Sequence, residues 1–236
     1  MKVLLCLFLF TISSCATKYI VPGNRYITPE SQGDAFRGQV EFQQSGANQL
    51  EINTPDGNTI DGVNYKDVSR TGFLLSNSLF NQFDVVWSHT GGGNSLLGGK
   101  FQFLGAPRSG KGTGHKAGLA VLFGGNEHET DDESVEFELT GREYLFLYGY
   151  RMSENLFPYV SFSYATYNFS GKINSNNGLD GQKPEFLTTS RGLNGGIEFA
   201  FEAFFAKLEA TYQQLMTDDT KDKERFTFGY SLGFSW

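Results

Sequence analysis

The sequence predicts an all-β, antiparallel barrel of about eight strands, or of ten if its early segments join the wall. Residues 226–236 place a large apolar side chain at every second position, which is the pattern of one strand face. Similar alternating segments recur upstream, and the links between them are short and long in turn. The chain also has 29 Gly and 23 Phe but only 2 Cys, a composition typical of closely packed β-structure and not of a disulfide scaffold.

The first fifteen residues, MKVLLCLFLFTISSC, have the layout of an export signal. Lys2 supplies the positive start, residues 3–10 form an apolar core, and small residues follow. This core is much shorter than the roughly 20 residues that a transmembrane helix needs. We therefore predict that residues 1–14 are a signal peptide that is removed on export.

Residues 12–15, ISSC, resemble the lipobox of bacterial lipoproteins, although Ile12 stands where Leu is more usual. The resemblance implies that Cys15 becomes the first residue of the mature chain and is acylated with palmitate-type chains. It also implies contact with the lipoprotein processing and sorting machinery, and Ala16 after the cysteine implies sorting to the outer membrane. The alternative is ordinary cleavage after Ala16. Because Cys6 lies in the signal peptide, the mature chain has no internal disulfide.

The next segments are less regular. We expect residues 15–34 to form a lipidated tether on the same side of the barrel as the C-terminus. Residues 35–70 form either an N-terminal hairpin extension or the first barrel strands, with a turn signal, SGAN, at residues 45–48. The barrel itself is expected to occupy residues 71–236, and its first segment, TGFLLSNSLF, is compatible with a strand.

Alternation with a period of two defines the predicted barrel strands. They lie at residues 83–89, 100–104, 117–123, 143–150, 159–169, 192–201, 204–215 and 226–236. Short links at 151–157 and 201–204 contrast with long polar links at 89–99, 124–134, 170–185 and 216–224. Membrane barrels show this contrast between periplasmic turns and external loops. The segment 105–116 is long for a periplasmic turn.

The final strand carries six large apolar residues and ends on the last of them. They are Phe226, Phe228, Tyr230, Leu232, Phe234 and Trp236. This arrangement resembles the C-terminal strand of bacterial outer-membrane barrels, which ends on an aromatic residue, usually Phe. The resemblance implies that these residues are a signal for the barrel-assembly machinery. It also implies that they face lipid, while the residues between them, from Thr227 to Ser235, face the lumen.

Alternation alone does not say which face of the wall is apolar. A soluble, lipocalin-like barrel would turn the apolar groups inward around a ligand. The opposite face here carries Arg151, Glu198, Lys207 and Glu209 together with many Gly and Ser residues. Such a face suits a narrow polar lumen, so we expect the apolar groups to contact the lipid of the outer membrane.

Several activities are disfavoured. The net charge of −7, without a basic face, argues against nucleic-acid binding. The segment GAPRSGKG, residues 105–112, lacks the Ser or Thr that ends a P-loop. The three histidines, His89, His115 and His128, lie apart, and Ser88 beside His89 would point to the other face of a strand. We therefore expect no catalytic residues, no cofactor and no metal site.

The predicted function is that of a non-enzymatic outer-membrane β-barrel lipoprotein of a Gram-negative-type envelope. Its role would be structural, or would involve surface interactions through the external loops. Two alternatives stay open. One is a lipid-modifying barrel enzyme of the lipid A deacylase or phospholipase type, and the other is a soluble lipocalin-like lipoprotein that binds a ligand.

Overall fold

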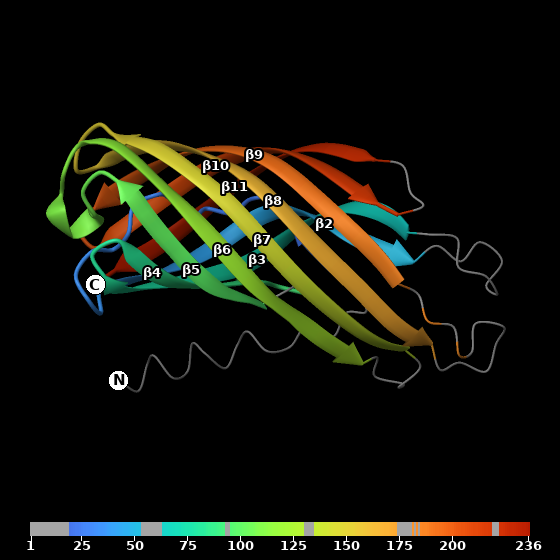
Figure 1. The fold of residues 1–236 in the computed structure, drawn as a ribbon. Helices are drawn as coiled ribbons and strands as arrows, with labels where there is room; N and C mark the ends of the chain where they lie inside the picture. The colour runs from blue at the N-terminus through green and yellow to red at the C-terminus, as the bar shows by residue number, and fades with distance from the viewer. Residues whose placement is uncertain are drawn as a thin grey trace.

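The computed structural model describes residues 19–52, 63–92, 95–129, 135–173, 181, 183, 185–218 and 222–236. It is a closed antiparallel β-barrel of ten strands, β2 to β11, with one further strand, β1, paired to β2 (Figure 1). The predicted fold class is confirmed, and the larger of the two expected strand numbers is the correct one. Among the described residues, no helix is long and apolar enough to cross a bilayer.

The strands follow one another around the wall in sequence order. They are β1 (Tyr19–Pro22), β2 (Gly38–Ile52), β3 (Val63–Phe80), β4 (Phe83–Thr90), β5 (Ser95–Leu104), β6 (Gly114–Glu129), β7 (Val135–Arg151), β8 (Leu156–Ile173), β9 (Glu185–Phe201), β10 (Phe204–Thr217) and β11 (Lys223–Ser235). A short 3-10 helix, η1 (Arg108–Gly110), lies between β5 and β6. All eight segments that the alternation predicted lie within β4 to β11, except that Trp236 directly follows β11.

Pairing of β2 with both β3 and β11 closes the barrel. The seam between β2 and β11 is short, since it joins only Gln39–Gln44 to Tyr230–Ser235. Farther along the same edge of β2, from Ala47 to Leu50, the partner strand is β1 and no longer β11. β1 therefore continues the seam beyond the point where the pairing between β2 and β11 stops.

Two expectations for the N-terminal third need correction. Residues 38–52 form one continuous strand, so the SGAN segment is not a turn. Of the two alternatives for residues 35–70, the structure shows the first barrel strands, because β2 and β3 belong to the barrel wall. The segment is held straight because β3 pairs with one edge of β2 while β1 and β11 pair with the other. Residues 20–33 do not form an exposed tether, because every one of them is buried inside the barrel.

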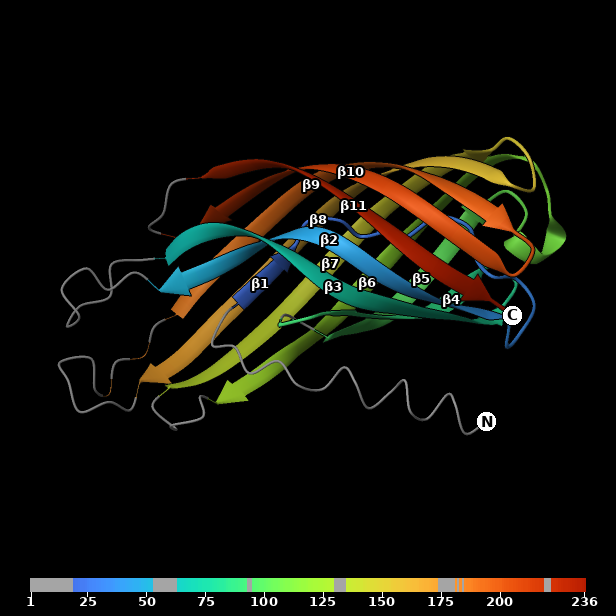
Figure 2. The ribbon, with the colours of Figure 1, turned by 180° about the vertical axis from the view of Figure 1, so that it is seen from behind.

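The two ends of the barrel differ. The turn end holds the C-terminus and the short connections 81–82, 105–113, 152–155 and 202–203, and η1 lies in the longest of them. The loop end, opposite, is where the remaining links between wall strands lie (Figures 1 and 2). In Figure 2, β1 lies in the half of the barrel nearer to the loop end.

Candidate functional site

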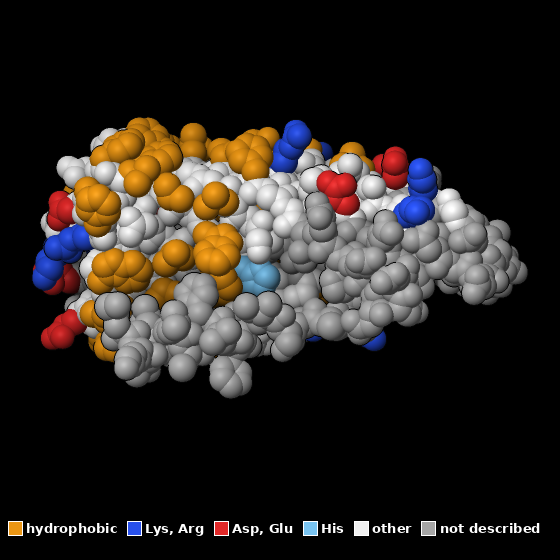
Figure 3. All heavy atoms as spheres, turned by 90° about the horizontal axis from the view of Figure 1, so that it is seen from below, with side chains coloured by type: hydrophobic (Ala, Val, Ile, Leu, Met, Phe, Trp, Pro, Cys, Tyr) orange, Lys and Arg blue, Asp and Glu red, His pale blue; other side chains and the backbone are white. Residues whose placement is uncertain are grey.

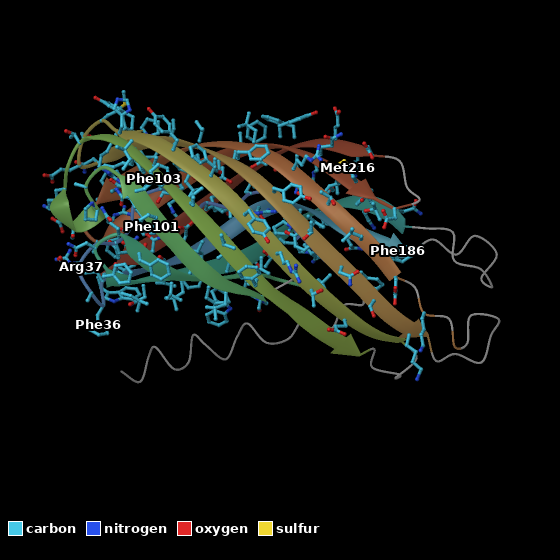
Figure 4. The ribbon with its side chains drawn as sticks, in the orientation of Figure 1. Phe36, Arg37, Phe101, Phe103, Phe186 and Met216 are labelled. Carbon is cyan, nitrogen blue, oxygen red and sulfur yellow. The ribbon has the colours of Figure 1, made fainter. Side chains whose placement is uncertain are left out.

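The outer face of the wall carries a broad apolar belt in its half nearer to the turn end. Figure 3 shows these side chains gathered there on one face, with charged groups beyond them at the turn end, and Figure 4 shows Phe101 and Phe103 near that end. Exposed members include Phe42, Leu97, Phe101, Phe103, Leu119, Phe123, Tyr144, Phe146, Tyr148, Val160, Phe162, Leu193, Ile197, Phe204, Leu208 and Tyr212.

The C-terminal strand contributes the longest row of the belt. Phe226, Phe228, Tyr230, Leu232, Phe234 and Trp236 are all exposed, and Phe228 reaches 72% exposure. Between them, Thr227 and Ser231 are buried. The strand therefore points its large apolar groups outward and its small polar groups inward, as expected. Whether these six residues also form a signal for assembly stays a prediction.

Toward the loop end the outer face becomes mostly polar. We call this part the crown, formed by residues 135–142, 165–173, 185–191, 213–217 and 223–225. Its outward side chains are mostly polar, and those of Glu138, Thr140, Arg142, Asn168 and Arg191 are exposed. Its interior contains an apolar cluster of Val21, Leu50, Leu139, Ala165, Tyr167, Phe169, Phe186 and Leu215. Buried polar side chains, including Thr188 and Gln213, lie beside this cluster.

Residues 20–33, which we call the luminal segment, fill the barrel lengthwise. Their backbone groups bond to wall side chains at successive levels. Gln213 Nε2 donates to the Pro22 carbonyl at 3.1 Å near the crown, and Ser78 Oγ donates to the Gly33 carbonyl at 2.8 Å near the turn end. On another side, Ile27 packs into an apolar cluster that includes Leu74, Leu122 and Leu147. The lumen is therefore occupied along the path of this segment.

Two wall carboxylates hold the upper part of the luminal segment. Glu209 accepts the backbone N–H groups of Arg25 at 2.7 Å and Tyr26 at 3.0 Å, one on each carboxylate oxygen. Glu143 accepts Arg25 Nε at 2.8 Å, and both side chains are almost inaccessible to solvent. The Tyr26 phenol donates to the Gln44 carbonyl at 2.8 Å.

A second charged cluster holds the lower part. The guanidinium of Arg151 donates to both carboxylate oxygens of Glu30, through Nε at 2.7 Å and through one terminal nitrogen, and that nitrogen also contacts Glu198 at 3.0 Å. Arg108, from η1, donates to the same Glu198 oxygen at 2.5 Å. Lys116 Nζ lies 3.6 Å from Glu30. Buried charges of both signs therefore neutralise one another, which is a condition for keeping them inside.

Sequence reasoning found some of these residues and missed others. Arg151, Glu198, Lys207 and Glu209 were expected on the luminal face, and all four are buried there. Arg25 and Glu30 were missed because they belong to a stretch without strand periodicity. Their partners lie more than a hundred residues away in the chain, and no local pattern indicates such a pairing.

The turn end has a recess of about 330 Å³ that is lined by several cations. Each of them already has a counterion: Arg37 pairs with Asp34 at 3.3 Å, and Lys111 pairs with Glu154 at 3.5 Å. Arg108 and Arg151 pair with the buried carboxylates of Glu198 and Glu30. Figure 4 shows Arg37 at this end, next to Phe36. The recess is balanced in charge and does not select an anion.

One pair of side chains on the outer face has a geometry that is used in nucleophilic catalysis. His89 in β4 and Ser95 in β5 are cross-strand neighbours, and His89 Nδ1 lies 2.8 Å from Ser95 Oγ. The imidazole is half-buried and contacts the ring of Phe73. Sequence reasoning considered only Ser88 beside His89. The partner Ser95 comes from the next strand, across the connection 91–94, and becomes visible only with the register of β4 and β5.

Other candidate sites do not gain support. Among the described residues, no group of three or more His, Cys, Asp and Glu side chains is placed to hold a metal ion. Cys15 and residues 1–14, with the predicted lipidation and signal peptide, lie outside the described residues.

Comparison with known proteins adds little. No protein-family model matches the chain, and no curated protein matches it either. Among solved structures, it is similar to the N-terminal β-barrel domain of Pseudomonas aeruginosa OprF, at 18% identity and a TM-score of 0.35, covering 87% of this chain and 100% of that one. The attachment invasion locus protein Ail of Yersinia pestis has 14% identity and a TM-score of 0.37, covering 86% and 99%. Neisserial surface protein A has 10% identity and a TM-score of 0.36, covering 84% and 95%.

Proposed function

We propose that this chain is a non-enzymatic outer-membrane β-barrel lipoprotein that acts through its loop end, either structurally or in surface interactions. The observation that carries the proposal is the apolar belt on the outer face of a closed barrel. Exposed aromatic and aliphatic side chains form contiguous rows on most of the wall strands. Water-soluble monomers rarely expose apolar patches of that extent, whereas transmembrane barrels require them.

The occupied lumen supports a role other than diffusion of solutes. A ten-stranded barrel is wider than an eight-stranded one, whose side chains alone fill it. Here the luminal segment takes up the additional space, with its polar groups bonded to the wall. The same feature disfavours the lipocalin-like alternative, which needs an apolar cavity for its ligand and a polar outer face.

Fractionation tests the membrane assignment. The folded protein should remain in the outer-membrane fraction after alkaline or high-salt washing, and its gel mobility should change on boiling. Removing Trp236 should lower the folded, membrane-inserted fraction, because it shortens the proposed signal for the barrel-assembly machinery. Release of a folded wild-type protein into the soluble fraction would refute the proposal.

Acylation of Cys15 has its own test. The wild-type protein should incorporate radiolabelled palmitate, and Cys15→Ser should not. Each buried methylene contributes about 0.8 kcal/mol, so several chains hold a protein firmly. The barrel would nonetheless stay in the membrane without them, held by its belt. If the wild type takes up no palmitate, the mature chain is exported without a lipid.

A second candidate function, hydrolysis of an acyl ester in a membrane lipid, is favoured by the contact between His89 and Ser95. A hydroxyl within hydrogen-bond distance of an imidazole is the geometry of an activated nucleophile. Ser95 Oγ would attack the ester carbonyl and form an acyl-serine, while His89 takes the hydroxyl proton and passes it to the leaving alkoxide. Water would then hydrolyse the acyl-serine, with His89 again carrying the proton.

The two candidates are separated by assay with a phospholipid that carries a labelled acyl chain, presented in vesicles that contain the refolded barrel. If the second candidate is correct, the wild type releases labelled fatty acid, and both Ser95→Ala and His89→Gln abolish the release. Ser88→Ala is the matched control, because Ser88 adjoins His89 but lies on the luminal face of β4, and it should keep full activity. Equal release by all four proteins, or none by the wild type, rules hydrolysis out.

A further inference from the structure

The direction in which the luminal segment runs determines where the chain before it must lie. β1 pairs Tyr19 with Leu50 and Pro22 with Ala47. β2 starts at the turn end, where Gly38 and Trp236 exchange backbone hydrogen bonds, and Leu50 is near its far end. Tyr19 is therefore close to the loop end, while Phe36 and Arg37 are at the turn end (Figure 4). The segment crosses the whole barrel, from the loop end to the turn end.

The lumen offers no return path for the residues that precede Tyr19. All of residues 20–33 are buried, and they contact the wall at each level: Asn24 bonds to Thr211 at 3.0 Å, Arg25 to Glu143, and Glu30 to Arg151. At the level of the crown the lumen also holds the apolar cluster that contains Val21, Leu50 and Leu215. The described chain therefore begins, at Tyr19, close to the loop end.

We infer that the mature amino terminus of this protein lies on the cell-surface side of the outer membrane. This inference rests on the proposed function, which places the loop end outside the cell. It reverses our expectation from the sequence that the tether and the C-terminus lie on the same side of the membrane.

Chain lengths support the reversal. The chain from Cys15 to Tyr19 extends at most about 14 Å. The stretch of β2 from Leu50 back to Gly38 covers about 40 Å at about 3.3 Å per residue. With a strand tilt of about 40°, this is about 30 Å along the barrel axis. An acyl group on Cys15 is thus too far from the turn end to enter the inner leaflet.

The inference is tested with single cysteine substitutions and a membrane-impermeant maleimide on intact cells. Thr17→Cys reports on the amino terminus, Asn177→Cys on the β8–β9 link at the loop end, and Lys111→Cys on the exposed turn beside η1. The wild type measures any labelling of Cys15 itself, which acylation would block. We expect Thr17→Cys and Asn177→Cys to be labelled equally before and after permeabilisation, and Lys111→Cys only after it.

The labelling results distinguish failure of this inference from failure of the proposed function. If Asn177→Cys is labelled on intact cells but Thr17→Cys needs permeabilisation, the inference is wrong and the proposed function stands. If Lys111→Cys is labelled on intact cells and Asn177→Cys is not, the barrel has the opposite orientation and both fall. An epitope inserted between Ala16 and Thr17 and detected by antibody on intact cells repeats the test without the maleimide. Labelling of wild-type Cys15 on intact cells would keep the surface location and remove only the lipid.

Discussion

The belt region and the crown are stacked in one continuous wall, yet their outer faces differ. In the belt region the outer face is apolar, and the interior holds paired charges such as Glu30 and Arg151 beside an apolar cluster around Leu147. In the crown the outer face is mostly polar, and the interior holds an apolar cluster around Tyr167 beside buried polar groups such as Gln213. Strands such as β7 and β8 run through both regions without a break.

Because the same strands cross both regions, we attribute the difference between their outer faces to the surroundings of each region and not to strand geometry. A strand needs only about 9–11 residues to cross a bilayer, whereas β7 has 17 and β8 has 18. The additional residues extend about 20 Å farther along the strand. We expect that length to stand in water above the bilayer, where an apolar core contributes to stability and an apolar exterior does not.

The largest effect is expected inside the belt region, from Arg151→Met. The substitution leaves Glu30 and Glu198 buried with fewer cationic partners, so the free energy of unfolding should fall by about 3–5 kcal/mol. Urea unfolding of the barrel in lipid vesicles measures it. Lys111→Met, which removes an exposed ion pair with Glu154, is the control and should change stability by less than about 0.5 kcal/mol. Equal effects would mean that the buried network does not hold the luminal segment.

Two leucines of β10 compare the regions directly. Leu215 points into the crown interior and is fully buried, whereas Leu208 points outward in the belt with 58% exposure. Leu215→Ala should cost about 2–5 kcal/mol of unfolding free energy, because it leaves a cavity. Leu208→Ala leaves no cavity and should cost about 1 kcal/mol or less. Unfolding curves of both variants in the same vesicles measure these losses. A larger loss of unfolding free energy for Leu208→Ala would contradict the interpretation of the crown interior as packed.

Two positions on β8 locate the border between the regions. Val160 and Asn168 lie on the same outer face, and both are exposed. Val160→Arg places a charge in the lipid and should cost about 2–4 kcal/mol, whereas Asn168→Arg lies above the lipid and should cost at most about 1 kcal/mol. If both substitutions cost the same in vesicles, the belt does not end where the polar side chains begin. Vesicles of thicker lipid should raise the cost of Asn168→Arg if the border lies close to it.

The smallest effect concerns the seam. Gly229 has no room for a side chain, since a methyl group there would lie 1.8 Å from Tyr26 Oη and 2.6 Å from the Gln44 carbonyl. Gly229→Ala should therefore cost about 1–3 kcal/mol through overpacking. A methyl group added at Gly195 would have no neighbouring atom within 4 Å, so Gly195→Ala should be neutral or slightly stabilising. The temperature at which the folded gel band disappears gives the ranking of the two, and a neutral Gly229→Ala would show that the luminal segment can shift.

The sequence was sufficient for features that depend on local alternation. A period of two places Phe226 to Trp236 on one face of a strand, and the charges of Glu198 and Lys207 on the opposite face indicated that the apolar face points outward. The position of residues 20–33 could not be predicted in this way. Arg25 and Glu30 are buried only because Glu143 and Arg151 lie opposite them across the lumen, and such pairing depends on the closed barrel. The contact of His89 with Ser95 likewise requires the register of two strands.

The short seam between β2 and β11 has a consequence for the order of assembly. A packed barrel cannot be threaded afterwards, and natural chains avoid threading, so residues 20–33 must be in place before the wall closes around them. Their pairing with β2 joins segments close in sequence, whereas the seam joins the two ends of the wall and spans only Gln39–Gln44. We therefore expect a sheet that first collects its own N-terminal strand and is then sealed by the C-terminal one. The C-terminal strand thus closes the barrel, and it does so around the luminal segment of the same chain.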